Sequence, residues 1–386
     1  MKNNRCKRYN CLSEIWPAID AMNLNNKKIA LFGYSRVHVL FAGELQKRKN
    51  IQSIIFVDNN ADHLLALNTE HQVIKPDVLN KKYRDYYVFI LSYHAKQMKE
   101  QLNKMGWIED SQYVVLKDLS LWQKEKKQNF ILENAEKKEI NREERKVILL
   151  EMLDDIQNIC GEYGLKYYLD GGTLLGSVRH KGFIPWDHDL DLMMPLEDAV
   201  VLGKIMEKHE KYDFMYITNT EGYSFMHPRI VRRHTRTLYN WMFHTLLYET
   251  PIYIDLDILG GYGNDRRTAA RYQAKMRRCW KDFEDYLIVE CSDKNKQDIV
   301  KKILDMQREM SYEASDYVGK IYGLAFADYF HKNSLEPAEY LLFEGRKIPV
   351  SKNYKYILEM YYGDYMKLPP IEARQYEEDY TYYWDS

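Results

Sequence analysis

The feature that most constrains the fold is a series of short, almost wholly apolar runs in the first third of the chain. They are IALF after Lys28, IQSIIFV before Asp58, YYVFIL around Phe89 and YVVL around Val115. Segments with helical spacing of apolar residues separate them. Apolar runs that alternate with helices are typical of a parallel sheet covered on both faces. The pattern predicts a Rossmann-like α/β domain over residues 1–122.

The turn after the first run bears on whether this domain binds a dinucleotide. A Rossmann fingerprint has glycines at three positions of this turn and an acid about 20 residues later. Here only the first glycine, Gly33, is present, and Ser35 stands where the second would let a pyrophosphate approach. Asp58 does end the next run. The turn therefore disfavours an NAD(P)-dependent oxidoreductase and leaves a scaffold, docking or regulatory role for the domain.

The rest of the chain divides into two parts. Residues 123–146 are charge-dense and contain no glycine or proline, which predicts an exposed, partly helical connector. Residues 147–386 begin with a helical apolar stripe that Gly161 or Gly164 can end. They continue as helices and short strands without a βαβ rhythm. We expect one α+β domain there, with a helical region around 265–325.

A glycine turn in this second domain is a candidate phosphate site. Gly171 and Gly172 stand between an apolar strand and a helical segment that begins near Thr173. Two glycines allow a tight turn and a close approach by a ligand. The free N–H groups and the positive dipole end of a helix favour an anion such as phosphate. Arg179 adds positive charge further along the helix.

Alternating acids follow this turn. If residues 189–194 form a strand, Asp189 and Asp191 lie on one face, because side chains alternate along a strand. Asp187 joins them if the strand starts early. Carboxylates this close repel each other unless a cation lies between them. Their oxygen ligands favour a hard divalent ion, Mg²⁺ or Mn²⁺.

A second acidic strand lies further along the chain. Asp255 and Asp257 alternate with apolar residues in IYIDLDIL, so they share one face of a predicted strand. One of them could supply a third carboxylate to the metal site, and the sequence leaves open which one. A single pair of alternating acids is usually a solvated strand face. The glycine turn, the basic helix and the acids together favour a site for phosphate and metal.

These segments resemble the LicD family of phosphotransferases, which lies in the polymerase-β-like nucleotidyltransferase superfamily and is related to fukutin. The resemblance rests on LDGGTLLGSVRHKGFIPWDHDLDL, on IYIDLDIL and on FEGRKIPVSKNYKYILEMYYGDYMKLPP, and it covers roughly residues 140–375. It implies a nucleotidyltransferase-like fold. It also implies transfer of a phospho-alcohol from a CDP-activated donor, with release of CMP. The acceptor would be a hydroxyl of a cell-surface glycan or its lipid-linked precursor, as in lipopolysaccharide or teichoic acid biosynthesis.

The resemblance also implies roles for individual residues. Asp189 and Asp191 match the family's metal-binding acids, Asp187 opens the same motif, and Asp255 matches the first acid of the second strand. All four would bind Mg²⁺ or Mn²⁺. Asp189, Asp191 and Asp255 would also be catalytic, and Asp255 could accept the proton of the attacking hydroxyl. The residues expected to bind donor phosphates are Gly171, Gly172, Thr173, Arg179, Arg229 and Arg232.

The sequence departs from the family's pattern at two places. His188 stands where an acid is common, and hard cations prefer oxygen to nitrogen. Leu256 and Asp257 follow Asp255 where an aromatic residue and a proline are more usual. It therefore stays open which acid of this strand completes the metal site.

The transferred alcohol is not decided by the sequence. We expect phosphocholine from CDP-choline, with ribitol phosphate or glycerol phosphate as the alternative. A quaternary ammonium binds aromatic faces, and the candidates for such a cage are Trp186, Tyr239, Trp241 and Tyr248. One rival function is a nucleotidyltransferase that uses an NTP on a small molecule. Another is a non-catalytic glycan-binding module, which the intact acids disfavour.

Composition narrows the remaining classes. The chain of 386 residues has 56 Lys and Arg against 57 Asp and Glu, which argues against a nucleic-acid partner bound through bulk positive charge. No apolar run approaches the ~20 residues that span a bilayer, and the N-terminus lacks the apolar core of a secretory signal. We expect a cytoplasmic protein, at the inner face of the membrane if its acceptor is lipid-linked. Many of the 33 tyrosines follow residue 310, where their rings could form an acceptor surface or pack the loops.

Overall fold

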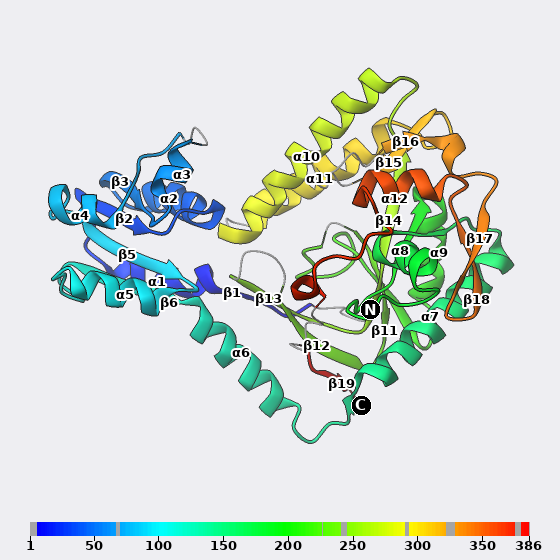
Figure 1. The fold of residues 1–386 in the computed structure, drawn as a ribbon, viewed down its shortest axis with the longest axis horizontal. Helices are drawn as coiled ribbons and strands as arrows, with labels where there is room; N and C mark the ends of the chain where they lie inside the picture. Colours follow the sequence, from blue (N-terminus) through cyan, green and yellow to red (C-terminus); the bar gives the residue numbers. More distant parts are fainter. Residues whose placement is uncertain are drawn as a thin grey trace.

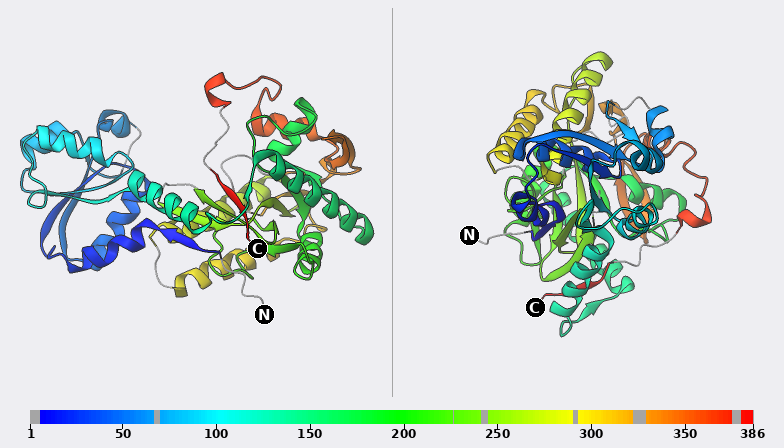
Figure 2. Two further views of the ribbon diagram at one scale, coloured as in Figure 1. Left: turned by 90° about the horizontal axis from the view of Figure 1, so that it is seen from below. Right: turned by 90° about the vertical axis from the view of Figure 1, so that its left-hand side faces the viewer.

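The chain forms a smaller and a larger lobe in the computed structural model (Figure 1). The structure describes residues 6–66, 70–225, 227–240, 245–289, 293–321, 329–374 and 380–385. The smaller lobe contains the N-terminal part of the chain, and the larger lobe contains both acidic segments (Figure 2). Within the described ranges, no helix is both long and apolar enough to cross a membrane.

The smaller lobe is built on five parallel strands in the order β4-β3-β2-β5-β6. The chain winds outwards from β2 to β4, then returns to β5 beside β2 and winds outwards on the other side. This confirms the predicted parallel sheet. The strands are β2 (Lys27–Phe32), β3 (Ile51–Val57), β4 (Val73–Ile74), β5 (Tyr87–Ser92) and β6 (Tyr113–Asp118). The helices are α1 (Cys11–Ala21), α2 (Arg36–Arg48), α3 (Ala61–Ala66), α4 (Pro76–Lys82), α5 (Ala95–Lys104) and α6 (Leu119–Glu133).

Strand β2 shows why apolar and polar residues do not alternate in these runs. Ile29 and Leu31 pack on the side of α1, α2 and α6, whereas Ala30 and Phe32 pack on the side of α4 and α5. Successive side chains point to opposite faces of a strand. Because helices cover both faces of this sheet, every position of the strand centre is buried.

The turn after β2 places a side chain where a dinucleotide would need free space. Gly33 has a φ of +119°, which favours glycine, and the ring of His38 lies directly over it. A Cβ on Gly33 would lie 2.5 Å from Nε2 of His38. Ser35 Oγ and His38 Nδ1 are 2.8 Å apart in a hydrogen bond, and Asp58 accepts a hydrogen bond from the backbone N–H of Tyr34. The polar groups of the turn and of Asp58 therefore hydrogen-bond within the protein. This agrees with the sequence-based argument against a dinucleotide.

Protonation of His38 should destabilise the protein in mild acid. Burial lowers the pKa of His38 to about 4, below the ordinary value of about 6.5. Between these pH values the unfolded chain binds a proton that the folded chain does not. The free energy of unfolding should therefore fall as the pH falls from about 6.5 to about 4, by up to about 3 kcal/mol. Urea denaturation at a series of pH values measures this loss. His38→Gln should remove it, and an unchanged pH dependence in that variant would contradict the assignment.

The predicted connector, residues 123–146, is mostly regular structure. Helix α6 starts before it and extends into its first half, where the ring centre of the buried Phe130 lies 5.9 Å from that of Tyr383 near the C-terminus. Strand β7 (Glu139–Ile140) and the first turn of α7 (Arg142–Tyr163) occupy its second half. The link between the lobes is therefore largely a helix, as Figure 1 shows.

A second sheet brings both ends of the chain to the junction between the lobes. Its order is β1-β13-β12-β19-β7, and all its pairs are antiparallel. Strand β1 thus pairs with the larger lobe, although we expected residues 1–122 to form one domain. The further strands of this sheet are β1 (Arg8–Asn10), β12 (Thr235–Asn240), β13 (Leu246–Thr250) and β19 (Tyr382–Trp384).

Buried contacts make the two lobes one packed unit. Leu247 and Ile288 of the larger lobe belong to the same apolar cluster as the core around α1. The buried side chain of Asn10 donates to the carbonyl of Ile288 at 3.3 Å. Arg36, at the start of α2, donates from Nε to Asp285 of helix α10 (Arg266–Val289) at 2.6 Å. The smaller lobe is therefore docked on the larger one through both apolar and charged contacts.

The larger lobe holds the mixed sheet that carries the acids. Its main order is β10-β11-β14-β15-β16, and β9 pairs with β14 in parallel. The strands are β8 (Tyr168–Leu169), β9 (Asp191–Pro195), β10 (Tyr212–Met215), β11 (Arg229–Arg232), β14 (Tyr253–Gly261), β15 (Tyr317–Lys320) and β16 (Tyr329–His331). The hairpin β17 (Glu339–Phe343) and β18 (Arg346–Val350) forms a separate two-stranded sheet.

The helices of this lobe largely follow the sequence pattern. Helix α7 buries the predicted apolar stripe and ends at Gly164, which is left-handed with a φ of +66°. The helix after the glycine turn begins at Gly171, two residues before the expected start. The remaining helices are α8 (Gly171–Arg179), α9 (Leu196–Met206), α10, α11 (Asp293–Glu309), α12 (Tyr354–Tyr362) and the short 3₁₀ turns η1 (Lys332–Ser334) and η2 (Ile371–Ala373).

Candidate active site

The two acidic segments meet where β9 and β14 lie side by side. In this parallel pair Asp191 is directly opposite Asp255. Asp189 precedes β9, so the strand starts two residues later than we expected. Carboxylate oxygens of Asp189, Asp191 and Asp255 all lie within 4.8 Å of one another. Asp187 and His188 form a second group of this kind with Asp189.

The glycine turn makes room for these carboxylates. A Cβ on Gly171 would lie 2.7 Å from Oδ2 of Asp191, and one on Gly172 would lie 2.6 Å from Oδ2 of Asp187. The hydroxyl of Thr173 accepts a hydrogen bond from the backbone N–H of Asp191 at 2.8 Å. These three residues therefore position the acids, and their role in binding phosphate stays a prediction.

A methyl group on Gly172 should weaken metal binding. Gly172→Ala would displace the carboxylate of Asp187, so we expect the affinity for Mn²⁺ to fall about tenfold or more, as for other changes next to metal ligands. Titration of free Mn²⁺ by electron paramagnetic resonance measures this. Gly161→Ala, in α7, is the matched control, because nothing lies within 4 Å of a Cβ there. Equal Mn²⁺ affinities in the two variants would show that the turn does not constrain the acids.

An arginine and a histidine lie against Asp255. Its Oδ1 accepts a hydrogen bond from Nε of Arg229 at 2.7 Å and lies 2.8 Å from Nε2 of His227. Burial favours the neutral carboxyl, but the charges of Arg229 and His227 hold the pKa of Asp255 well below its usual range. A carboxylate that stays ionised suits a metal ligand and is a weak proton acceptor. The structure therefore disfavours the role of proton acceptor that we expected for Asp255.

Neither predicted arginine of β11 is placed to bind the donor's phosphates. The side chain of Arg229 is 2% exposed, and its guanidinium carbon lies 3.5 Å from the ring centre of Phe225 and 3.7 Å from that of Tyr253. These two rings therefore enclose the guanidinium of Arg229 beside Asp255. Arg232 is on the opposite face of the strand, where it donates to the carbonyl of Lys211 at 3.1 Å. Arg229 thus positions Asp255, and Arg232 belongs to the surface of the sheet.

Loss of Arg229 should reduce stability far more than loss of Arg232. Arg229→Met leaves Asp255 buried without its main partner, which typically costs about 3–5 kcal/mol. Arg232→Met alters a partly exposed side chain and should cost less than about 1 kcal/mol. Urea denaturation compares the two variants, and similar losses would contradict the buried ion pair. Adding Asp255→Asn to Arg229→Met should restore part of the stability, because it removes the unpaired charge.

Asp257 has a different partner from Asp255. Its Oδ2 lies 2.5 Å from Nζ of Lys320, which is also 2.7 Å from Oδ2 of Asp170. Asp255 is therefore the acid of β14 that joins the carboxylates of the first acidic segment. The geometry thus favours Asp255 over Asp257 as the third carboxylate of this group.

The grouped acids fit a hard divalent cation. Burial and the charge of Asp189 raise the pKa of Asp187 to about 8. Burial and the charges of Asp189 and Asp255 raise the pKa of Asp191 well above its usual value. A cation between these carboxylates would relieve their repulsion. Carboxylates with one nearby imidazole suit Mg²⁺ or Mn²⁺ better than a thiophilic metal.

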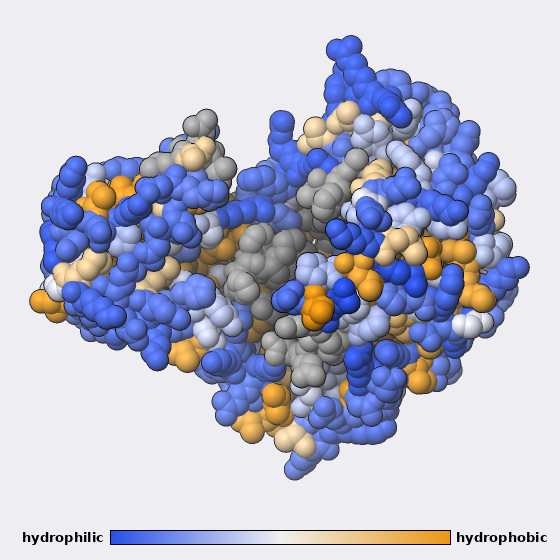
Figure 3. All heavy atoms as spheres, viewed as in Figure 1, coloured by the Kyte–Doolittle hydropathy of each residue, from blue (hydrophilic) through white to orange (hydrophobic). Residues whose placement is uncertain are grey.

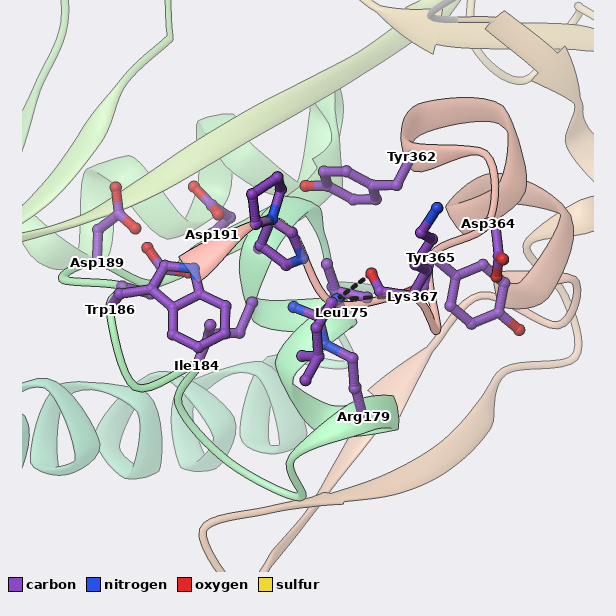
Figure 4. Close-up of a pocket in the computed structure, with 15 residues that line it drawn as sticks. Leu175, Arg179, Ile184, Trp186, Asp189, Asp191, Tyr362, Asp364, Tyr365 and Lys367 are labelled. Carbon is purple, nitrogen blue, oxygen red and sulfur yellow. Dashed lines mark hydrogen bonds between the residues drawn. The ribbon is translucent and has the colours of Figure 1, made fainter. Parts of the chain in front are cut away.

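A cleft of about 770 Å³ opens in front of the acids. Figure 4 shows Asp189, Asp191 and Trp186 on one side of it, and Tyr362 with its hydroxyl directed toward Asp191. The opposite side comes from the chain that follows α12. The residues that line the cleft are Gly172, Leu175, Arg179, Ile184, Trp186, Asp187, Asp189, Asp191, Tyr362, Asp364, Tyr365, Lys367, Leu368, Pro369 and Pro370.

Arg179 is the predicted phosphate-binding arginine that does line the cleft. Its Nη1 donates to the carbonyls of Tyr365 and Lys367 at 3.0 and 3.4 Å, which ties α8 to the far side. The cleft residues after α12 were not predicted as site residues. The signal that could have found them is the family-like segment near the C-terminus, for which we had predicted only an acceptor surface of tyrosine rings or packing of the loops.

The predicted aromatic cage is only partly available. Trp186 lines the cleft. Tyr248 is fully buried in the core, and Tyr239 is stacked on another ring at a centroid distance of 5.2 Å. Trp241 lies outside the described residues. The rings that line the cleft are Trp186, Tyr362 and Tyr365.

Comparison with known proteins agrees with this geometry. The profile of the family described as "LicD/FKTN/FKRP, nucleotidyltransferase domain" matches residues 164–255, which contain the glycine turn and the acids. The lipopolysaccharide cholinephosphotransferase LicD of Haemophilus influenzae is 29% identical over 261 residues, 62% of this chain and 96% of that protein. The chain therefore contains a LicD-family domain.

Two further relatives match the chain over shorter stretches. Mouse ribitol 5-phosphate transferase FKRP is 34% identical over 106 residues, 23% of this chain and 22% of that protein. The human protein of the same name is 56% identical over 36 residues, 9% of this chain and 7% of that protein. The match thus spans nearly all of the Haemophilus protein but less than a quarter of either FKRP.

Proposed function

We propose that this LicD-family phosphotransferase moves a phospho-alcohol, first of all phosphocholine, from a CDP-activated donor to a hydroxyl of a glycan, and releases CMP. The acceptor is a cell-surface glycan or its lipid-linked precursor. The observation that carries the proposal is the meeting of Asp189, Asp191 and Asp255 beside a cleft large enough for a nucleotide. The names of two relatives, a cholinephosphotransferase and a ribitol 5-phosphate transferase, support the same reaction class.

The side chains of the cleft have different roles in this reaction. Asp189, Asp191 and Asp255 would hold Mg²⁺ or Mn²⁺, an ion that neutralises charge on the donor diphosphate and on the departing CMP. Arg179 lines the cleft and brings a positive charge to phosphate oxygens there. Asp187 lines the same cleft outside that group of three. We propose that Asp187 accepts the proton of the attacking glycan hydroxyl, because Asp255 is already paired with Arg229.

The lining of the cleft supports choline as the first donor to test. The rings of Trp186, Tyr362 and Tyr365 offer faces to a quaternary ammonium. Ribitol phosphate or glycerol phosphate is the alternative, because Asp364 and Lys367 of the same cleft can hydrogen-bond hydroxyl groups. A nucleotidyltransferase that uses an NTP would instead release pyrophosphate.

Exposed apolar side chains near the cleft support an acceptor that carries a lipid. Met366, Leu368 and Ile371 are 55, 42 and 75% exposed. The turn η2, which contains Ile371, projects from the larger lobe in the left view of Figure 2. Figure 3 shows small apolar groups over this face of the larger lobe amid hydrophilic surface. We propose a cytoplasmic enzyme that works at the inner face of the membrane and has no nucleic-acid partner.

The smaller lobe fits a Rossmann-like domain that has lost its nucleotide site. The strand order and the parallel pairing support this fold. His38 fills the space over Gly33, and Arg36 is bound to the larger lobe. We therefore propose that the domain docks on the catalytic lobe and binds no dinucleotide.

Release of CMP tests the proposed reaction. The protein is incubated with CDP-choline, CDP-ribitol or CDP-glycerol, with Mg²⁺ or Mn²⁺ and an oligosaccharide acceptor in free or lipid-linked form. We expect CMP release that EDTA abolishes and that Asp189→Asn with Asp191→Asn lowers more than about 100-fold, because charge compensation by the ion contributes several kcal/mol. Gly161→Ala should retain wild-type turnover. Wild-type turnover in the double variant would refute the site, and pyrophosphate release from an NTP would favour the alternative.

A further inference from the structure

A buried lysine behind the active site has two carboxylate partners. Lys320 ends β15, and its Nζ lies 2.7 Å from Oδ2 of Asp170 and 2.5 Å from Oδ2 of Asp257. The exposed fractions of the three side chains are 7, 0 and 11%. None of the three lines the cleft, and none has a role in the proposed reaction.

The two carboxylates stand on the two backbone segments that carry the metal-binding acids. Asp170 immediately precedes the glycine turn, and its backbone N–H donates to the carbonyl of Asp191 at 3.1 Å. Asp257 is two residues beyond Asp255 on β14 and on the same face of the strand. The ammonium group also lies 5.0 Å from the ring centre of Tyr361, next to the cleft residue at the end of α12. It thus joins the turn, the strand and this helix at one point.

The charge of Lys320 stabilises this junction, and the junction depends on it. Burial opposes the ammonium, but the charges of Asp170 and Asp257 hold the pKa of Lys320 well above its ordinary value. Without the ammonium, two buried carboxylates would repel each other across the gap between the turn and the strand. The turn touches the carboxylates of Asp187 and Asp191, so a shift of the turn would reach the metal-binding acids.

We propose that Lys320 is a positioning residue that holds the glycine turn against strand β14 and so sets the spacing of the metal-binding carboxylates. It acts through Asp170 and Asp257 and touches neither metal nor substrate. The inference rests on the proposed function only where turnover is measured, since metal binding can be followed without a substrate.

The test compares Lys320→Met with a second broken ion pair outside the cleft. Arg233 Nη1 lies 2.9 Å from Oδ2 of Asp213, and their side chains are 12 and 8% exposed. We expect Lys320→Met and Arg233→Met both to lower the melting temperature. Only Lys320→Met should weaken Mn²⁺ binding, by about tenfold or more, in a titration of free Mn²⁺ by electron paramagnetic resonance. Wild-type Mn²⁺ affinity in Lys320→Met would overturn the proposal, as would an equal loss in both variants.

A second variant covers the case in which Lys320→Met does not fold. Lys320→Met combined with Asp170→Asn and Asp257→Asn leaves no unpaired buried charge and keeps side chains of similar size. We expect this triple variant to fold and to bind Mn²⁺ about tenfold or more weakly than the wild type. Wild-type affinity in the folded triple variant would overturn the proposal.

Turnover separates this proposal from the proposed function. In Lys320→Met the Mn²⁺ concentration for half-maximal CMP release should rise by the same factor as the dissociation constant, with a smaller change at saturating Mn²⁺. If the wild type binds Mn²⁺ but releases CMP from no donor, the proposed reaction fails while the binding comparison still decides the role of Lys320. If the wild type releases CMP and Lys320→Met shows wild-type Mn²⁺ dependence, the role of Lys320 fails alone.

Discussion

The larger lobe depends on bringing several carboxylates together in a place where water solvates them poorly. Burial disfavours each ionised group, and their mutual repulsion opposes their approach. The fold offsets part of this charge with Arg229 beside Asp255 and with Lys320 beside Asp257. A divalent ion would supply the remaining positive charge. The buried cations are therefore as much a part of the site as the acids.

Steric constraints decide the rest of the site. Gly171 and Gly172 leave space that carboxylate oxygens occupy, so the turn sets how closely α8 can approach the acids. Arg179 then connects this helix to the chain after α12, which forms the other side of the cleft. Elements that are far apart in the sequence are thereby held around one small volume. The tyrosines noted in the composition contribute Tyr362 and Tyr365 to the cleft, while many others, such as Tyr248, pack the interior.

The smaller lobe combines a parallel sheet with a first turn that its own side chains fill. The side chain of His38 occupies the space over Gly33, and Arg36 at the head of α2 binds an acid of α10. Strand β1 adds to the sheet that contains β12 and β13 of the larger lobe. The two lobes therefore share a core. The domain boundaries expected at residues 122 and 147 follow the sequence pattern more closely than they follow the packing.

Local pattern by itself determined the parallel sheet and the candidate acids, because both depend on the spacing of neighbouring residues. Alternation with helices marked the buried strands, and the two-residue spacing of Asp189 and Asp191 marked one face. Only the tertiary structure decided which groups meet, since pairing between distant strands cannot be seen in local spacing. Pairing of β9 with β14 set Asp255 opposite Asp191, and Lys320 on β15 engaged Asp257. Arg229 and Arg232 look alike in the sequence, but they lie on opposite faces of one strand, and so one supports an acid and the other lies at the surface.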